Sequence, residues 1–201
     1  MGKQTAVFKY LPGLQDLLFF SIFAAALLLG PRMLNMDGDL HKHLTIGKYV
    51  LDGNLPPVND IFSHTRYGTP FAPHKWLSGV FFYLSYRYLN EIGIVVLTGI
   101  LLAATFTLIY SDAVKRTNVR LATILLVAGG AAVSSLHWIA RPHIFTMIFL
   151  AIWLIWSERL ASGKNIPLWY FPALMLVWNN IHGEFISGFL VTIACLGGWL
   201  W

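Results

Sequence analysis

Long apolar segments separated by short polar ones occupy most of the chain. A helix needs about 20 apolar residues, at a rise of about 1.5 Å each, to cross a bilayer. Two of the segments are shorter, so interfacial aromatic side chains or protein contacts must complete their ends. The first apolar segment, residues 14–34, is long enough to stay in the membrane as an uncleaved anchor. The pattern predicts membrane spans at residues 14–34, 92–111, 121–138, 144–157, 168–181 and 185–201.

The longest polar interruption, residues 35–91, follows the first predicted span. Its residues 40–51 predict a short amphipathic helix, the Pro pair within 55–57 predicts an extended segment, and the Gly-Thr-Pro motif within 67–70 predicts a turn. Residues 76–90 are apolar but contain Ser, Arg and Tyr, which suits a helix in the membrane interface better than a span. We expect an all-α, polytopic transmembrane helical bundle whose long first loop carries juxtamembrane helices.

The distribution of positive charge predicts the orientation, because Lys and Arg in short loops collect on the cytoplasmic side. With residues 76–90 outside the membrane core, the segments 1–13, 112–120 and 158–167 fall on one side and hold seven Lys and Arg residues. We expect these segments, and so the N-terminus, to be cytoplasmic in a multi-pass protein of the cell inner (plasma) membrane. Residues 35–91 then form an extracytoplasmic loop.

The composition agrees with a membrane protein, since 57% of the residues are hydrophobic and only 11% are charged. The net charge of +5 is accounted for by the loops, and no dense basic patch is present, so we expect no nucleic-acid partner. The chain stops inside an apolar run. We therefore expect residues 1–201 to be a single transmembrane domain and the N-terminal part of a longer protein.

The first candidate for chemistry is "DGDLHKH", at the point where the first apolar segment ends. Asp39 and His43 are four residues apart, as are Asp37 and His41, so each pair shares one face of a helix. A partly dehydrated carboxylate can take a proton from a hydroxyl. A divalent metal held by Asp37, Asp39 and His43 is an alternative, and no other cofactor is expected. Simple helix capping by the aspartates explains the motif equally well.

Two later polar segments, "HWIARPHIF" at residues 137–145 and "NNIHGEF" at 179–185, are predicted on the same outer face. Their Arg141, His143 and His182 suit a phosphate group, which depends on cations and hydrogen-bond donors. The alternatives are a snorkelling arginine and, for His182 with Glu184, a polar turn between spans.

The whole loop resembles the first external loop of polytopic bacterial membrane proteins of the GT-C glycosyltransferase superfamily. The shared pattern is Asp-x-Asp, a His, a Gly, Gly-x-x-Pro-x-x-Asp-x-Phe-Ser-x-Thr, a Gly and Trp-Leu. It falls on Asp37, Asp39, His43, Gly47, Gly53, Pro56, Asp60, Phe62, Ser63, Thr65, Gly68, Trp76 and Leu77. "ARPH" at residues 140–143 and "WNNIHGEF" at 178–185 also look like segments of that group.

The superfamily includes protein O-mannosyltransferases, aminoarabinose transferases and oligosaccharyltransferases. The resemblance implies a sugar donor on a polyprenyl-phosphate-type lipid and transfer to a glycan, lipid or protein acceptor at the extracytoplasmic face. It implies that Asp39 or Asp37 is catalytic. The residues that we expect to bind the substrates are His43, Asp60, Trp76, Arg141, His143, His182 and Glu184.

Two other classes fit parts of the pattern. A membrane transporter or lipid flippase could use the polar loop as an outer gate, but transporters place ionisable residues near the bilayer midplane, and the predicted spans contain almost none. A haem-binding membrane subunit could use His137, His143 and His182, but it leaves the aspartates unexplained. A glycosyltransferase is the function that we expect from the sequence.

Overall fold

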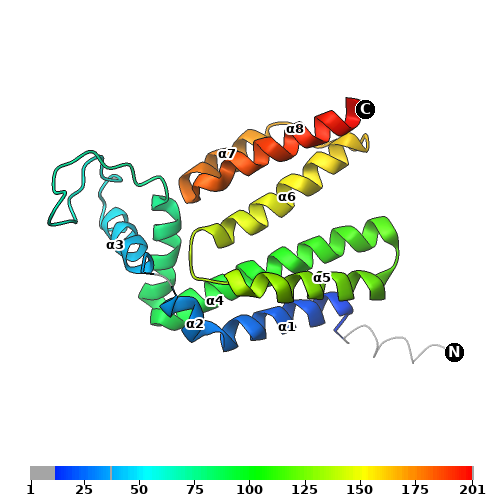
Figure 1. The fold of residues 1–201 in the computed structure, drawn as a ribbon, viewed down its shortest axis with the longest axis horizontal. Helices are drawn as coiled ribbons and strands as arrows, with labels where there is room; N and C mark the ends of the chain where they lie inside the picture. The colour runs from blue at the N-terminus through cyan, green and yellow to red at the C-terminus, as the bar shows by residue number, and fades with distance from the viewer. Residues whose placement is uncertain (1–11, 37, 201) are drawn as a thin grey trace.

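The computed structural model describes residues 12–36 and 38–200, and within these residues the chain is helical, with no β-strand (Figure 1). Residues Ser135–His137 and Gly183–Phe185 form short 3-10 turns. The helices are α1 (Leu14–Leu28), α2 (Gly30–Asn35), α3 (Leu40–Leu51), α4 (Trp76–Thr117), α5 (Arg120–Ser134), α6 (His143–Ala161), α7 (Tyr170–Ile181) and α8 (Ile186–Leu200). The predicted all-α class is confirmed.

Within the described residues, three helical stretches are long and apolar enough to cross a membrane: Trp76–Thr117, Arg120–His137 and His143–Ala161. The apolar helices at Leu14–Leu28 and Gly183–Gly198 are shorter. These lengths support membrane association. The bundle of six spans and its orientation stay predictions.

The first predicted span divides into two helices. The first helix, α1, ends at Leu28, and α2 begins at Gly30 with Pro31 in its first turn. Proline is favoured there because the first helical N–H groups have no partner within the helix. The bounds of α3, Leu40–Leu51, coincide with the predicted amphipathic helix.

Helix α4 changes direction at Asn90, whose φ of 53° and ψ of −144° are not helical. Its first part, residues 76–89, is the segment in which we predicted an interfacial helix. Just after the break, a Cβ at Gly93 would clash with the Ser85 carbonyl oxygen, so the two parts meet in close backbone contact. The turn separates a short helix at one end of the molecule from the long helix that follows.

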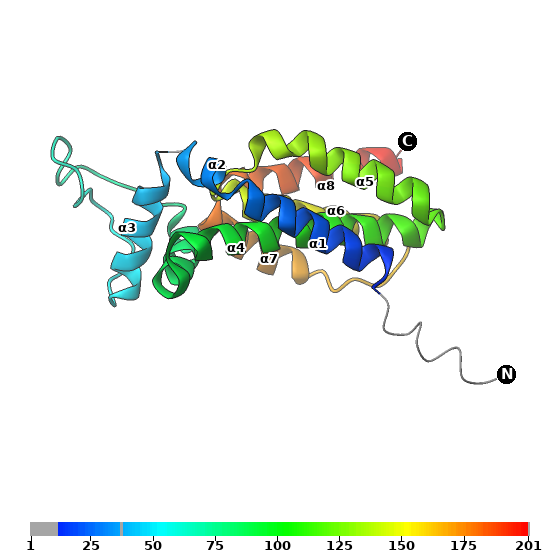
Figure 2. The same ribbon diagram turned by 90° about the horizontal axis from the view of Figure 1, so that it is seen from below.

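Two groups of apolar side chains hold the bundle together. In the larger group, Ile22 and Ala26 of α1 pack with Leu102 and Phe106 of α4 and with Trp138. Figures 1 and 2 show α1 running along the second part of α4, with α5 beside them. The smaller group joins Leu40, Phe82, Ile94, Ala140, Phe145 and Ile181. It therefore connects α3, both parts of α4, α6 and α7 at one end of the bundle.

Helix α3 crosses the first part of α4 through two glycines. A Cβ on Gly79 would lie 2.6 Å from the His43 carbonyl oxygen, and one on Gly47 would overlap the Gly79 carbonyl group. The obstacle in both cases is backbone, which cannot turn aside as a side chain can. The two helices can approach this closely only because both positions lack a side chain.

We expect Gly47→Ala to lower the free energy of unfolding by about 3 kcal/mol, at the upper end of what overpacking costs, because the new methyl group meets backbone. Thermal unfolding of the detergent-solubilised protein measures the change. Gly129→Ala is the matched control, because Gly129 lies inside α5 with open space around it. It should stabilise the helix by about 0.5–1 kcal/mol. Equal melting temperatures for Gly47→Ala and the wild type would contradict this account of the crossing.

Candidate functional site

Four segments come together at the end of the bundle where α3 lies (Figure 1). They are the stretch from α2 into α3, the start of α4, the turn before α6 and the end of α7. The Ala140 amide donates to the Met33 carbonyl at 3.1 Å, which ties the segment before α6 to α2. The Trp76 indole Nε1 donates to the Asn180 side-chain oxygen at 2.8 Å, which ties the start of α4 to the end of α7. Segments that are far apart in the sequence are therefore held side by side.

Asp39 and Arg141 form the central ion pair of this end. Arg141 Nη2 donates to Asp39 Oδ2 at 3.1 Å, between residues 102 positions apart in the sequence. Asp39 occupies the N-cap position of α3, yet its carboxylate makes no capping hydrogen bond. The capping interpretation therefore does not describe Asp39.

The ion pair contributes little to stability. The Asp39 side chain is 53% exposed and that of Arg141 is 44% exposed. Exposed pairs of this kind are worth at most about 1 kcal/mol. The main consequence of the Asp39–Arg141 pair is that it orients the two side chains. A carboxylate and a guanidinium are held together at a surface where a ligand can reach both.

His43 lies one helical turn after Asp39 and is buried, with its ring centre 6.5 Å from that of Phe82. A small cavity of about 60 Å³ opens beside it, and its polar lining consists of Asp39, Lys42, His43, His74 and Lys75. This volume is the space of about two water molecules. Lys42, Ile46 and Phe71 also line an adjoining pocket of about 220 Å³, which offers more room.

Asp60 lines this adjoining pocket, but its carboxylate is hydrogen-bonded to residues of its own loop. Its Oδ1 accepts hydrogen bonds from the Phe62 and Ser63 amides at 2.9 Å, and its Oδ2 accepts one from the Ser63 hydroxyl at 2.5 Å. The hydrogen bond from the Ser63 side chain, followed by those from the two amides, lowers the pKa of Asp60. Such bonds shape a loop, and they leave Asp60 poorly suited to accept a proton.

His182 belongs to a buried hydrogen-bonded chain with Thr146 and Trp178. The Trp178 indole donates to Thr146 Oγ1 at 2.9 Å, and Thr146 Oγ1 lies 3.0 Å from His182 Nδ1. The Thr146 hydroxyl accepts from Trp178 and so can give its own hydrogen to Nδ1. With the ring neutral, this assigns the proton to Nε2.

Burial lowers the pKa of His182 to about 4, and the charges of Lys75, His143, His74 and His43 act in the same direction. His182 is therefore neutral at pH 7. The Glu184 carboxylate lies 3.3 Å from Nδ1 and forms an ion pair only when the ring is protonated. Since 61% of the Glu184 side chain is exposed, the carboxylate is readily hydrated when the ring is neutral.

Two other predicted residues, His143 and Trp76, stabilise the segments around the site through hydrogen bonds. The His143 ring donates from Nε2 to the His137 carbonyl at 3.0 Å, within the turn that carries Arg141. Trp76 holds the end of α7 through Asn180. Both positions support the segments around the Asp39–Arg141 pair.

The structure thus brings several predicted residues to one end: Asp39, His43, Trp76, Arg141, His143, His182 and Glu184. Asp60 belongs to the adjoining pocket, and Asp37 lies outside the described residues. Sequence reasoning missed the roles of Thr146, Trp178, Asn180 and His74. Thr146 left a signal as a polar residue near the start of an apolar segment, and Trp178 and Asn180 stand in the quoted segment "WNNIHGEF".

Within residues 12–36 and 38–200, no group of three His, Cys, Asp or Glu side chains could hold a metal ion. The predicted set of Asp37, Asp39 and His43 includes a residue outside that part of the chain and stays a prediction.

We found no match to this chain among protein-family models, curated proteins or solved structures. Over the part of the chain that it describes, the structure defines an all-helical fold with three helices long and apolar enough to cross a membrane and a polar site at one end of the bundle.

The lowered pKa of His182 predicts a specific loss of stability in acid. In the unfolded chain a histidine binds its proton near pH 6.5, whereas folded His182 resists it down to about pH 4. The folded state should therefore lose about 2 kcal/mol between pH 7 and pH 5 through this residue. Melting temperatures measured across this range should fall less in His182→Gln than in the wild type. The exposed His64 provides the control, since His64→Gln should retain the wild-type dependence; an unchanged slope in His182→Gln would contradict the assignment.

Proposed function

We propose that the chain is all or part of an integral membrane glycosyltransferase of GT-C type. It transfers a sugar from a polyprenyl-phosphate-type lipid donor to a glycan, lipid or protein acceptor. The proposed location is the plasma membrane of a bacterium, with the N-terminus cytoplasmic and the site extracytoplasmic. The observation that carries this proposal is the Asp39–Arg141 pair at the meeting point of four polar segments.

In the proposal, the two members of the pair have different roles in the transfer. The bond between the sugar C1 and the phosphate oxygen breaks, and a bond from C1 to the acceptor oxygen forms. In the proposal a carboxylate, Asp39 or Asp37, takes the acceptor proton as general base. Arg141 stabilises the negative charge that develops on the departing phosphate, and the Nε2–H of neutral His182 provides a further donor on the same end.

An apolar cavity beside the site supports a lipid donor. It has a volume of about 550 Å³ and lies between the α1–α2 junction, α3 and the bend of α4. Leu34, Leu44 and Val95 are among its apolar lining residues, while His41 and Glu91 provide polar groups. A lipid chain fits the apolar part, because its burial there removes hydrocarbon from water. Helix α3, whose N-cap is Asp39, forms part of its wall.

Replacement of the aspartates tests the proposal. We expect Asp39→Asn to lower sugar transfer by at least about 100-fold, the lower end of what a general base contributes. Asp37→Asn is measured beside it, since either carboxylate is a candidate. The assay follows a labelled sugar from a panel of polyprenyl-phosphate donors into product, using membranes that contain the full-length protein.

Asp52→Asn is the matched control for charge, because Asp52 follows the other end of α3 and pairs there with Lys48 at 2.8 Å. It should leave transfer unchanged. Wild-type transfer in both Asp39→Asn and Asp37→Asn would refute the catalytic assignment. Movement of the lipid-linked sugar across the bilayer with no covalent product would favour a flippase instead.

A further inference from the structure

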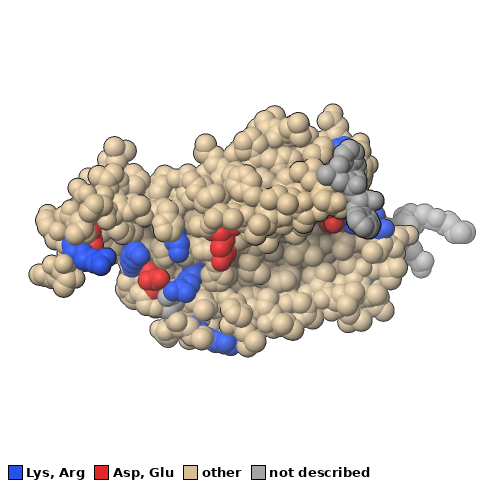
Figure 3. Space-filling view, turned by 45° about the horizontal axis from the view of Figure 1, so that its top comes forward, with Lys and Arg blue, Asp and Glu red and all other residues tan. Residues whose placement is uncertain are grey.

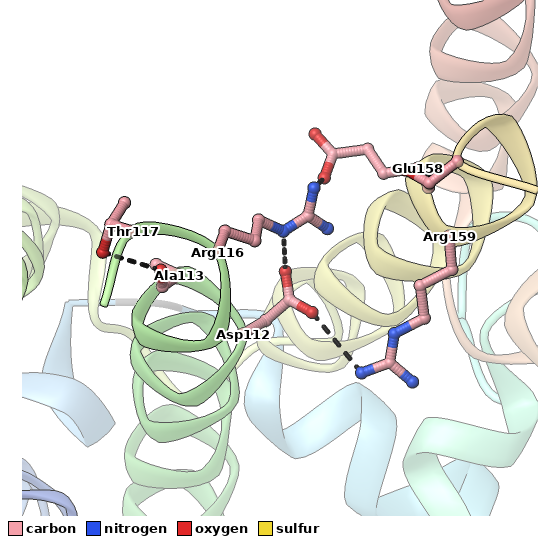
Figure 4. A network of polar contacts seen from close by, with 7 residues as sticks. Asp112, Ala113, Arg116, Thr117, Glu158 and Arg159 are labelled. Atoms are coloured by element: carbon pink, nitrogen blue, oxygen red, sulfur yellow. Dashed lines mark hydrogen bonds and ion pairs between the residues drawn. The ribbon is translucent and has the colours of Figure 1, made fainter. Parts of the chain in front are cut away.

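A second polar cluster lies at the other end of the bundle, where α4 and α6 end (Figure 4). Asp112 accepts from Arg116 Nε at 2.5 Å and from Arg159 Nη2 at 3.4 Å. Arg116 also pairs with Glu158. One carboxylate with a side chain only 13% exposed thus holds two guanidinium groups from different helices. Figure 3 shows charged side chains over one half of this face and a separate, smaller group at the opposite end, with an uncharged stretch between the two groups.

The two arginines border a pocket of about 330 Å³. This volume lies at the lower end of the range of ligand sites, about 300–1,000 Å³. The pocket is formed by the end of α4, the end of α6 and the loop that follows α6, and its polar lining residues are Asp112, Lys115, Arg116, Arg159, Ser162, Lys164 and Asn165.

Positive charge exceeds negative charge in this pocket. Four cationic side chains line it against the single carboxylate of Asp112, and counting Glu158 as well leaves a formal charge of +2. Over the described residues, the amino groups of Lys115 and Lys164 have no ion-pair partner. Internal pairing therefore orients the arginines but does not neutralise the site.

We propose that this pocket binds the phosphate group of an anionic ligand. Arginine presents several N–H donors in a planar fork that matches phosphate oxygens, and lysine adds point charge. The arginines are held in place before a ligand arrives, which lowers the ordering cost of binding. The Asn165 amide supplies another donor within the lining. This site is separate from the one proposed for sugar transfer and does not depend on that function.

The position of the pocket favours a phospholipid headgroup as the source of the phosphate. Asp112, Lys115 and Arg116 lie in the last turns of α4, and Arg159 lies in the last turn of α6. Both helices are long and apolar enough to cross a membrane, so their ends are at the depth of the headgroups if they do so. Basic pockets at such helix ends attract anionic lipids.

Neutralisation of the unpaired lysines tests this proposal without breaking an ion pair. We expect Lys115→Gln and Lys164→Gln each to weaken retention of phosphatidylglycerol by about five-fold, the contribution of one cation near a membrane surface. Native mass spectrometry of the full chain, released from bilayers of mixed phosphatidylglycerol and phosphatidylcholine, measures this retention. Thermal unfolding of the same samples should show both variants as stable as the wild type.

Arg120→Gln is the matched control, because Arg120 is exposed at the start of α5, on the same end of the bundle but outside the pocket lining. It should retain phosphatidylglycerol as the wild type does. Equal retention by all four proteins would overturn the proposal. An equal loss in the three variants would also overturn it, because that result indicates a general surface charge instead of a site.

Competition distinguishes the two sources of phosphate. Inorganic phosphate at millimolar concentration should fail to displace phosphatidylglycerol if the headgroup is the ligand. If inorganic phosphate displaces the lipid, and the displacement is weaker in Lys115→Gln and Lys164→Gln, the phosphate site stands and its ligand is soluble.

Discussion

The close backbone contact between Gly47 of α3 and Gly79 of α4 is the constraint on which the candidate site depends. It lays α3 against the first part of α4, and the bend at Asn90 turns that pair across the end of the long helix. Asp39, which precedes α3, is thereby brought to Arg141, just before α6. A bulkier residue at either glycine would move the carboxylate away from Arg141.

The two ends of the bundle use ion pairs differently. At the site, the Asp39–Arg141 pair is half exposed and adds little stability, so its geometry leaves both groups accessible to a ligand. At the other end, Asp112 is largely buried and holds two arginines, while Lys115 and Lys164 have no ion-pair partner among the described residues. In both places one carboxylate orients a cation that has further donors, which is an arrangement suited to phosphate.

Several features followed from the sequence because they are local. Apolar segment length predicted the all-α class, and the amphipathic pattern of residues 40–51 predicted α3 with its observed bounds. The division of the first predicted span, residues 14–34, into α1 and α2 did not follow from apolar length alone. The candidate site could be predicted from the sequence only in part. The four-residue spacing indicated Asp39 and His43 as candidates. It did not distinguish a helix-capping role from a catalytic role, because helix register does not show which groups a carboxylate contacts.

The sequence by itself determined which segments are apolar helices and which polar residues stand at their ends, because helix formation and hydrophobic burial depend on near neighbours in the chain. Only the tertiary structure decided that Asp39 pairs with Arg141. It also decided that Thr146 and Trp178 form a hydrogen-bonded chain with a neutral His182. The hydrogen bonds of Asp60 within its own loop were likewise seen only in the structure. The pair and the His182 chain join residues far apart in the sequence, so they exist only once the helices have packed. The bonds of Asp60 are local, but they depend on the final shape of a loop.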